Sequence, residues 1–383
     1  MTFAGSCRGL PSGEMRRVPP AGGMPGAAPP VAEASRSGQT PDTARDEGRR
    51  RTRPPASRSF RNIDRPPIER NRPAMLANGI TGTGISAHKR ADDLSDLDAE
   101  LDMIEALGVE TIELPTYDMD IVVGGRIRRP QLEALKRAVA GRDAGFSVHG
   151  PLSINFMDEA YRLPRHFEVL EASLEVAAEV GAENYVIHSG LAPRQQGDGI
   201  EAAYGRQREW LAKAGDVARQ HGLYLCVETL FAGFDGRGYA STPERLAREL
   251  AAIAHPNVMA TLDFSHSYLK LDFDGRRDAF VEEVKALAPY ARHLHVHDSF
   301  GRQDDIWMFT EGERLAYGHG DLHLPVGWGD IPWETLMDVC TFPEGAVFNI
   351  ELKQRYWYAA QEAVDATKAL AAKARVESRA EAA

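Results

Sequence analysis

The chain has 383 residues, of which 43% are hydrophobic and 26% are charged, a composition typical of a soluble protein with a sizeable core. Positions 1–74 contain 14 Arg and 7 acidic residues, so 31 basic and 49 acidic residues follow them. The net charge after position 74 is therefore −18, which disfavours contact with phosphate backbones. No apolar run approaches the roughly 20 residues that span a bilayer, and three separated cysteines provide neither a disulfide framework nor a thiolate metal site. We therefore expect a cytoplasmic protein without a membrane span, and the acidic body disfavours a nucleic-acid partner without excluding one.

The first 74 residues are rich in Pro, Gly, Ser, Ala and Arg and lack a sustained apolar period. Such a segment buries too little apolar surface to offset the entropy of ordering, so we predict a disordered Arg/Pro-rich extension over residues 1–74. Its Arg-rich stretch, residues 49–53, could be a functional basic tail, but the favoured interpretation is that translation begins near Met75, where the globular pattern starts. Residues 75–383 are predicted to form one domain.

From Ile80 onward, eight strand-length runs of β-branched or apolar residues alternate with amphipathic segments. In the amphipathic segments, apolar residues recur on one face, and Ser95 is predicted to cap the first helix. Eight alternations predict an α/β fold, a (β/α)8 TIM barrel. An open doubly wound sheet is the competing architecture, but no glycine-rich phosphate loop follows the first strand. The predicted strands are residues 80–85, 109–114, 145–150, 184–189, 223–229, 257–263, 292–297 and 345–351.

Imidazole and carboxylate groups occur at the ends of these predicted strands. Because the carboxyl ends of parallel strands meet at one mouth of a barrel, we expect these groups to converge there. A single histidine at a strand end is more often hydrogen-bonded in the core than a ligand, but nine buried groups without partners would be very costly. Nitrogen and oxygen donors without thiolates suit Mn²⁺, Zn²⁺, Co²⁺ or Fe²⁺, and one such ion or several would compensate the buried groups. The candidate ligands are His149, His188, Glu228, Asp263, His266, His295, Asp321, His323 and Glu351.

The strand ends carry, in chain order, the stretches VHGPLSIN, VIHSG, VET, TLDFSH, HLHVHD, GDLHLPVGWGDIPW and NIEL. Together these stretches resemble the xylose isomerase-like TIM-barrel superfamily, which includes sugar phosphate isomerases/epimerases and the endonuclease IV family. In ketose 3-epimerases of this superfamily, one metal is held by two Glu, one Asp and one His. The resemblance places this set on Glu228, Glu351, Asp263 and His295. It also implies that Glu228 and Glu351 move a proton through a metal-stabilised enediolate, a role that suits paired carboxylates beside a Lewis acid.

The five other candidate ligands complete the trinuclear pattern of endonuclease IV, so the resemblance implies one to three metal ions per chain. Leu152, however, occupies a position where that family tends to carry a DNA-stacking aromatic residue. The leading hypothesis is therefore a metal-dependent isomerase or epimerase that acts on a sugar, a sugar phosphate or a polyol. The first alternative is a metal-dependent phosphodiesterase that acts at abasic DNA sites, and the second is a metal-containing barrel that binds a small ligand without turnover.

Four further residues are candidates for contact with a small-molecule sugar or polyol substrate. Glu113 and Tyr117 lie just past the second predicted strand, and an ordinary place on the barrel rim is an equal alternative for both. By alternation His297 shares the strand face of His295, so it is a candidate for orienting a ligand residue or contacting the substrate, and a simple structural hydrogen bond is an equal alternative. Lys353 follows the last predicted strand and could polarise a substrate oxygen. A homo-oligomer is also compatible with the sequence.

Overall fold

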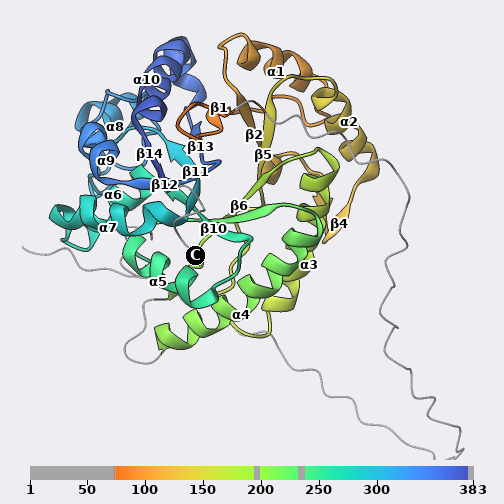
Figure 1. Ribbon diagram of the computed structural model, residues 1–383, viewed down its shortest axis with the longest axis horizontal. Coiled ribbons are helices and arrows are strands. Elements are labelled where there is room, and N and C mark those ends of the chain that lie inside the picture. The colour runs from red at the N-terminus through yellow and green to blue at the C-terminus, as the bar shows by residue number, and fades with distance from the viewer. Residues whose placement is uncertain (1–72, 74, 194–198, 232–237, 378–383) are drawn as a thin grey trace, which may run out of the picture. The chain divides into compact units, whose positions relative to one another are not determined.

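Eight parallel strands close into a barrel, and the helices that connect them lie outside it (Figure 1). The computed structural model describes residue 73 and residues 75–193, 199–231 and 238–377. The predicted extension over residues 1–74 therefore lies outside the described residues, apart from Pro73. The barrel belongs to one compact unit, Asp64–Ala383. Its strands are β1 (Gly82–Ser86), β2 (Thr111–Pro115), β5 (Gly145–His149), β6 (Asn184–His188), β8 (Tyr224–Glu228), β10 (Val258–Asp263), β11 (Ala291–Val296) and β13 (Val347–Ile350).

Each of the eight predicted strands overlaps one strand of the barrel, so the predicted (β/α)8 architecture is confirmed. Around the barrel the strands follow the order β1-β13-β11-β10-β8-β6-β5-β2, and β2 pairs with β1 to close it. The helices are α1 (Leu97–Glu105), α2 (Arg129–Val139), α3 (Leu163–Glu179), α4 (Gly199–Gln220), α5 (Pro243–Ile253), α6 (Phe264–Phe273), α7 (Phe280–Leu287), α8 (Glu311–Tyr317), α9 (Trp333–Val339) and α10 (Ala360–Lys373).

Within the part of the chain that the structure describes, three two-stranded sheets lie outside the barrel. The antiparallel pairs are β3 (Val122–Val123) with β4 (Arg126–Ile127), and β7 (Ala192–Pro193) with β9 (Gly238–Tyr239). The parallel pair is β12 (Thr341–Pro343) with β14 (Arg375–Glu377), which joins the chain before β13 to the segment after α10.

The two faces of the barrel strands differ in chemistry. Outward residues are apolar, as in β11, where Leu294 and Val296 belong to the main hydrophobic core between strands and helices. His293 and His295, which alternate with them along β11, point to the barrel interior and contact Glu113 of β2. Most barrels of this type fill the interior with branched apolar side chains. In this barrel, polar groups occupy the interior, and these groups need hydrogen-bond or metal partners.

The helices bury the faces that their periodicity predicted, as Leu170, Leu174 and Ala177 of α3 show. The predicted cap of the first helix is wrong by one residue. Asp96, not Ser95, precedes α1, and the Asp96 side chain accepts from the backbone N–H of Ala91 instead of capping the helix. The turn over residues 91–96, in which Leu94 has a φ of 60°, therefore sets the start of α1. Among the described residues, no helix combines the length and apolar character that crossing a membrane requires.

Candidate metal centre

All nine predicted ligands lie at or just beyond the carboxyl ends of barrel strands. The final residues of β5, β6, β8 and β10 are His149, His188, Glu228 and Asp263. His295 is the fifth of six residues of β11, and Glu351 directly follows β13. The other three ligands are His266 in the first turn of α6, and Asp321 and His323 between α8 and α9.

The middle of the site is the Nδ1 atom of His295, toward which three carboxylates converge. Its distances are 3.3 Å to Oε1 of Glu228, 3.6 Å to Oδ2 of Asp263 and 3.4 Å to Oε2 of Glu351. Three carboxylates and one imidazole within this radius form a donor set for a divalent cation, because oxygen and nitrogen ligands bind such ions at about 2.0–2.2 Å. We call Glu228, Asp263, His295 and Glu351 the central group.

A second group shares Glu228 with the central group. Oε2 of Glu228 lies 3.1 Å from Nε2 of His149 and 3.6 Å from Nε2 of His188. Nδ1 of His149 is directed at the carbonyl oxygen of Gly150 at 3.0 Å, an interaction that fixes the orientation of the imidazole. The two oxygens of Glu228 thus face different sets of imidazoles.

The third group consists of His266, Asp321 and His323, and the start of α6 positions its first member. The Asp263 side chain caps α6 by accepting from the backbone N–H of His266 at 2.7 Å, which holds His266 beside the barrel mouth. Oδ2 of Asp321 lies 3.4 Å from Nε2 of His266 and 2.7 Å from Nε2 of His323. His323 has a φ of +47°, a strained conformation for a residue with a side chain.

The surroundings favour the charged form of several predicted ligands, whereas burial lowers the pKa of His188 to about 4 and favours its neutral form. Burial lowers the pKa of His295, but Glu351, Glu113 and Glu228 raise it more, so that the pKa lies well above its usual range. Burial raises the pKa of Glu228, but the surrounding imidazoles outweigh this effect and hold the pKa well below the usual range. For His323, burial is outweighed by Asp321, and the pKa rises to about 9. A cation bound among these groups would therefore have to displace the protons of His295 and His323.

The residues fit a divalent cation, on the chemistry and placement of the donors. Within each of the three groups, ligand atoms of three residues lie within 4.8 Å of one another, and the same holds for His297, His323 and Glu351. Glu228, Asp263 and His295 are each at most 1% exposed. Buried carboxylates need a compensating positive charge. One cation bound by the carboxylates and the neutral imidazoles together would supply this charge.

A cavity of about 160 Å³ opens beside Glu351 and His323. Lys353 and Tyr117, both predicted to contact substrate, line this cavity, whereas Glu113 and His297 are buried and do not line it. The ammonium of Lys353 donates to the backbone carbonyl of Asp321 at 2.8 Å. Nε2 of His297 lies 3.0 Å from Oδ2 of Asp263, so His297 contacts a member of the central group.

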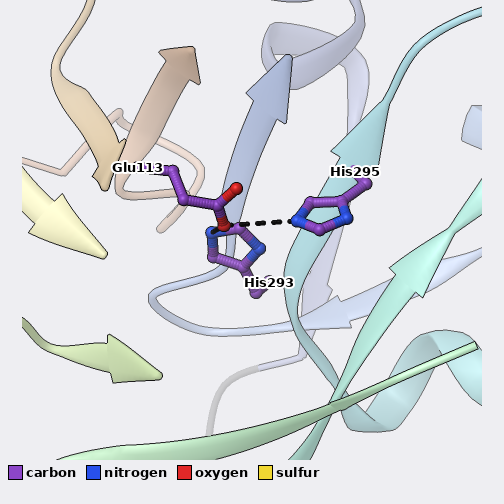
Figure 2. A group of neighbouring side chains, drawn as sticks. All are labelled: Glu113, His293 and His295. Atoms are coloured by element: carbon purple, nitrogen blue, oxygen red, sulfur yellow. Dashed lines mark hydrogen bonds and ion pairs between the residues drawn. The ribbon is translucent and has the colours of Figure 1, made fainter. Parts of the chain in front are cut away.

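Two histidines of the site region were missed by the sequence analysis. His88 lines the cavity just beyond β1, and the strand-end rule used for the other ligands would have found it. His293 is fully buried on β11, two residues before His295, and strand alternation alone would have placed it on the same face. Figure 2 shows the rings of His293 and His295 next to the carboxylate of Glu113, whose Oε2 atom lies 3.4 Å and 3.2 Å from their respective Nε2 atoms.

Comparisons with known proteins agree with this architecture. The barrel is similar to a D-tagatose 3-epimerase-like protein, with 19% identity, a TM-score of 0.52 and coverage of 75% of this chain and 98% of that one. It is also similar to D-psicose 3-epimerase determined in the presence of D-fructose (15% identity, TM-score 0.53, coverage 76% and 99%) and to L-ribulose 3-epimerase (14%, 0.51, 76% and 91%).

At these identities, the structural likeness concerns the fold. A comparison with curated protein sequences gives no significant match. The model of the xylose isomerase-like TIM barrel family, however, matches residues 101–373, which is most of the chain. The chain therefore belongs to the xylose isomerase-like TIM barrel family.

Proposed function

We propose that this protein is a metal-dependent isomerase or epimerase that acts on a sugar, a sugar phosphate or a related polyol. The observation that carries the proposal is the placement of two carboxylates, Glu228 and Glu351, around one nitrogen of His295 at the barrel mouth. They come from β8 and from the end of β13, which are not neighbouring strands. Two carboxylates that reach one centre from separate strands suit proton removal and proton return at a single carbon.

The central group would hold the divalent cation, which when bound supplies Lewis-acid stabilisation of charge beside the reacting carbon. Mn²⁺, Zn²⁺, Co²⁺ and Fe²⁺ all suit the nitrogen and oxygen donors. Burial of Glu228, Asp263 and His295 excludes bulk water from their side of the centre. In such surroundings, electrostatic interactions with the reacting atoms are stronger than in water.

The chain's own carboxylates would move the proton. Glu228 is ionised at neutral pH, since the surrounding imidazoles hold its pKa well below the usual range, and the ionised carboxylate is the form that accepts a proton. Glu351 lines the cavity, so its carboxylate is accessible to a bound substrate. In this proposal one of the two takes the proton from the carbon next to the carbonyl, and the other returns a proton to complete the isomerisation or epimerisation.

The cavity beside Glu351 supplies groups for recognition of a hydroxylated substrate. Tyr117 and Lys353 line it, together with His88 and Ser86. A phenol, an ammonium and an imidazole are donors that suit the oxygens of a sugar or polyol, whereas the Ser86 hydroxyl donates to Glu113. The rings of Tyr117 and His149 are nearly perpendicular, with 5.2 Å between their centroids, so Tyr117 also contacts a predicted metal ligand.

The test is turnover of a panel of ketoses by the purified full chain loaded in turn with Mn²⁺, Co²⁺ or Zn²⁺. Formation of an epimer or an aldose by the wild type, and its loss in Glu351→Gln, is the expected result. Glu283→Gln is the matched control, since Glu283 is also a buried carboxylate but pairs with Arg276 on the outer layer of the barrel. Absence of any product from the metal-loaded wild type with the whole panel would contradict the proposal.

A second candidate function is phosphodiester hydrolysis at abasic sites in DNA, as in the endonuclease IV family. The observation that favours it is the presence of two further ligand groups beside the central one, a suitable donor set for a cluster of three ions. Against it stand the charge of −18 after residue 74 and Leu152, which is 44% exposed where that family tends to carry an aromatic residue. Specific nicking of an abasic duplex by the metal-loaded protein would favour this function over the first.

A further inference from the structure

Glu113 lies inside the barrel with both carboxylate oxygens engaged by protein groups. Its Oε2 atom faces Nε2 of His295 at 3.2 Å and Nε2 of His293 at 3.4 Å (Figure 2). Its Oε1 atom accepts from the hydroxyl of Ser86 at 2.9 Å and from the amide of Asn349 at 3.3 Å. With an exposure of 1%, Glu113 has no free oxygen for a substrate.

The role of Glu113 depends on which ring nitrogen of His295 carries the hydrogen. A neutral imidazole has one N–H donor and one nitrogen lone pair. Nδ1 of His295 faces Glu228, Asp263 and Glu351, whereas Nε2 faces Glu113 as its nearest carboxylate. A cation settles where most carboxylates converge, so the lone pair is needed on Nδ1 and the hydrogen on Nε2.

Glu113, His293 and His295 could also be considered as a separate metal site, because their ligand atoms lie within 4.8 Å of one another. Such a site would require the lone pair of His295 on Nε2, and this tautomer would place an N–H on the side of the three carboxylates. The cation would also have to compete for the carboxylate of Glu113, whose two oxygens already have four polar neighbours. A hydrogen-bonding role is therefore better supported than a second cation.

We propose that Glu113 is a positioning residue that accepts the Nε2–H of His295 and so fixes the tautomer and the ring orientation that direct Nδ1 into the central group. The inference rests on the proposed function, since it assumes that the central group binds a divalent cation. A carboxylate partner on the outer nitrogen also increases the basicity of a ligating imidazole. Ser86, which lines the cavity, and Asn349 hold the carboxylate of Glu113 in place from the other side.

The experiment measures the Zn²⁺ affinity of the purified full chain by competition with a chelator. His295→Ala identifies which binding step belongs to the central group. In Glu113→Ala and Glu113→Gln, that step should weaken by about 10–100-fold, the usual effect of losing a partner of a metal-ligating histidine. The Gln variant keeps the volume but offers a single acceptor oxygen to the donors around it. Glu283→Gln should retain the wild-type affinity.

A second readout does not depend on affinity or on turnover. In the Zn²⁺-loaded protein labelled with ¹⁵N-histidine, the signal that disappears in His295→Ala should report a proton on Nε2 in the wild type. In Glu113→Ala this proton should exchange faster with solvent or the tautomer should change. Folded Glu113 variants with wild-type Zn²⁺ affinity and an unchanged His295 signal would overturn the inference. Zn²⁺ binding through His295 with this Glu113 dependence, but without turnover of any ketose, would instead contradict only the proposed function.

Discussion

Replacement of Glu228 by Gln is the perturbation for which the structure makes the sharpest prediction. The Glu228 carboxylate links the central group to the second group, because Oε1 faces His295 and His266 while Oε2 faces His149 and His188. The amide keeps the side-chain volume but has no charge and one acceptor oxygen. We expect the fold to persist and the activity to be lost.

The magnitude follows from two functions that the carboxylate combines. Loss of a general acid or base alone lowers the rate by about 10²–10⁴-fold. Loss of a charged ligand adds to this effect, so we expect kcat/KM to fall by at least about 10³-fold. Since each factor of ten corresponds to about 1.4 kcal/mol, the transition state would lose at least about 4 kcal/mol of stabilisation.

The assay compares kcat/KM for the best ketose, bound metal by elemental analysis and thermal unfolding for the wild type, Glu228→Gln and the control Glu283→Gln. A cooperative unfolding transition in both variants would show that the fold is retained. The control should keep its activity because Arg276 and the backbone N–H of Glu244, not the barrel mouth, are the partners of Glu283. A Glu228→Gln variant that keeps more than about a tenth of the wild-type kcat/KM would refute the role given to this carboxylate.

Three further predictions concern metal binding and the barrel interior. Zn²⁺ at 100 times its Kd should stabilise the protein by about 2.7 kcal/mol, and chelation should reverse the accompanying rise in Tm. Because Asp321 raises the pKa of His323 to about 9, the contribution of their ion pair to metal-free stability should be complete below about pH 6.5 and decline as the pH rises through 9. Zn²⁺ must displace the proton of His323, so the affinity for Zn²⁺ should rise with pH between about 6.5 and 9. Calorimetry in buffers of different ionisation enthalpy would detect the released proton. Gly84→Ala should lower the free energy of unfolding by about 1–3 kcal/mol, since the added Cβ would lie 2.3 Å from Oγ1 of Thr111. The control Gly205→Ala on α4 meets nothing closer than 4.0 Å and should raise the free energy of unfolding, and denaturant unfolding measures both.

The ligand set could be predicted from sequence because two local rules place it. Side chains alternate along each strand, and all parallel strands of a barrel end at one mouth, so His149, Glu228 and Asp263 had to meet. His266 follows the same logic through the helix cap, since Asp263 three residues earlier accepts its backbone N–H. None of these placements depends on knowing which strands are neighbours.

The partners of the ligands could not be predicted in this way. Glu113 on β2 and His295 on β11 are separated in the barrel by β1 and β13, and their contact depends on how side chains interleave across the interior. The links from Ser86 and Asn349 to Glu113 depend on the same interleaving. Local sequence indicates only that Glu113 faces inward, which left contact with a substrate as a reasonable expectation. The predicted cap of α1 was wrong because the turn over residues 91–96, which the sequence analysis did not predict, sets the first helical residue.

The most direct measurement of the central claim is exchange of solvent deuterium into the carbon beside the carbonyl of a ketose. The metal-loaded wild type in D₂O should introduce one deuterium at that carbon, and Glu228→Gln and Glu351→Gln should introduce none at a comparable rate. This result would also exclude a barrel that binds ligand without turnover. Product without deuterium at that carbon, or exchange that continues at the wild-type rate in both variants, would contradict proton transfer by these two carboxylates.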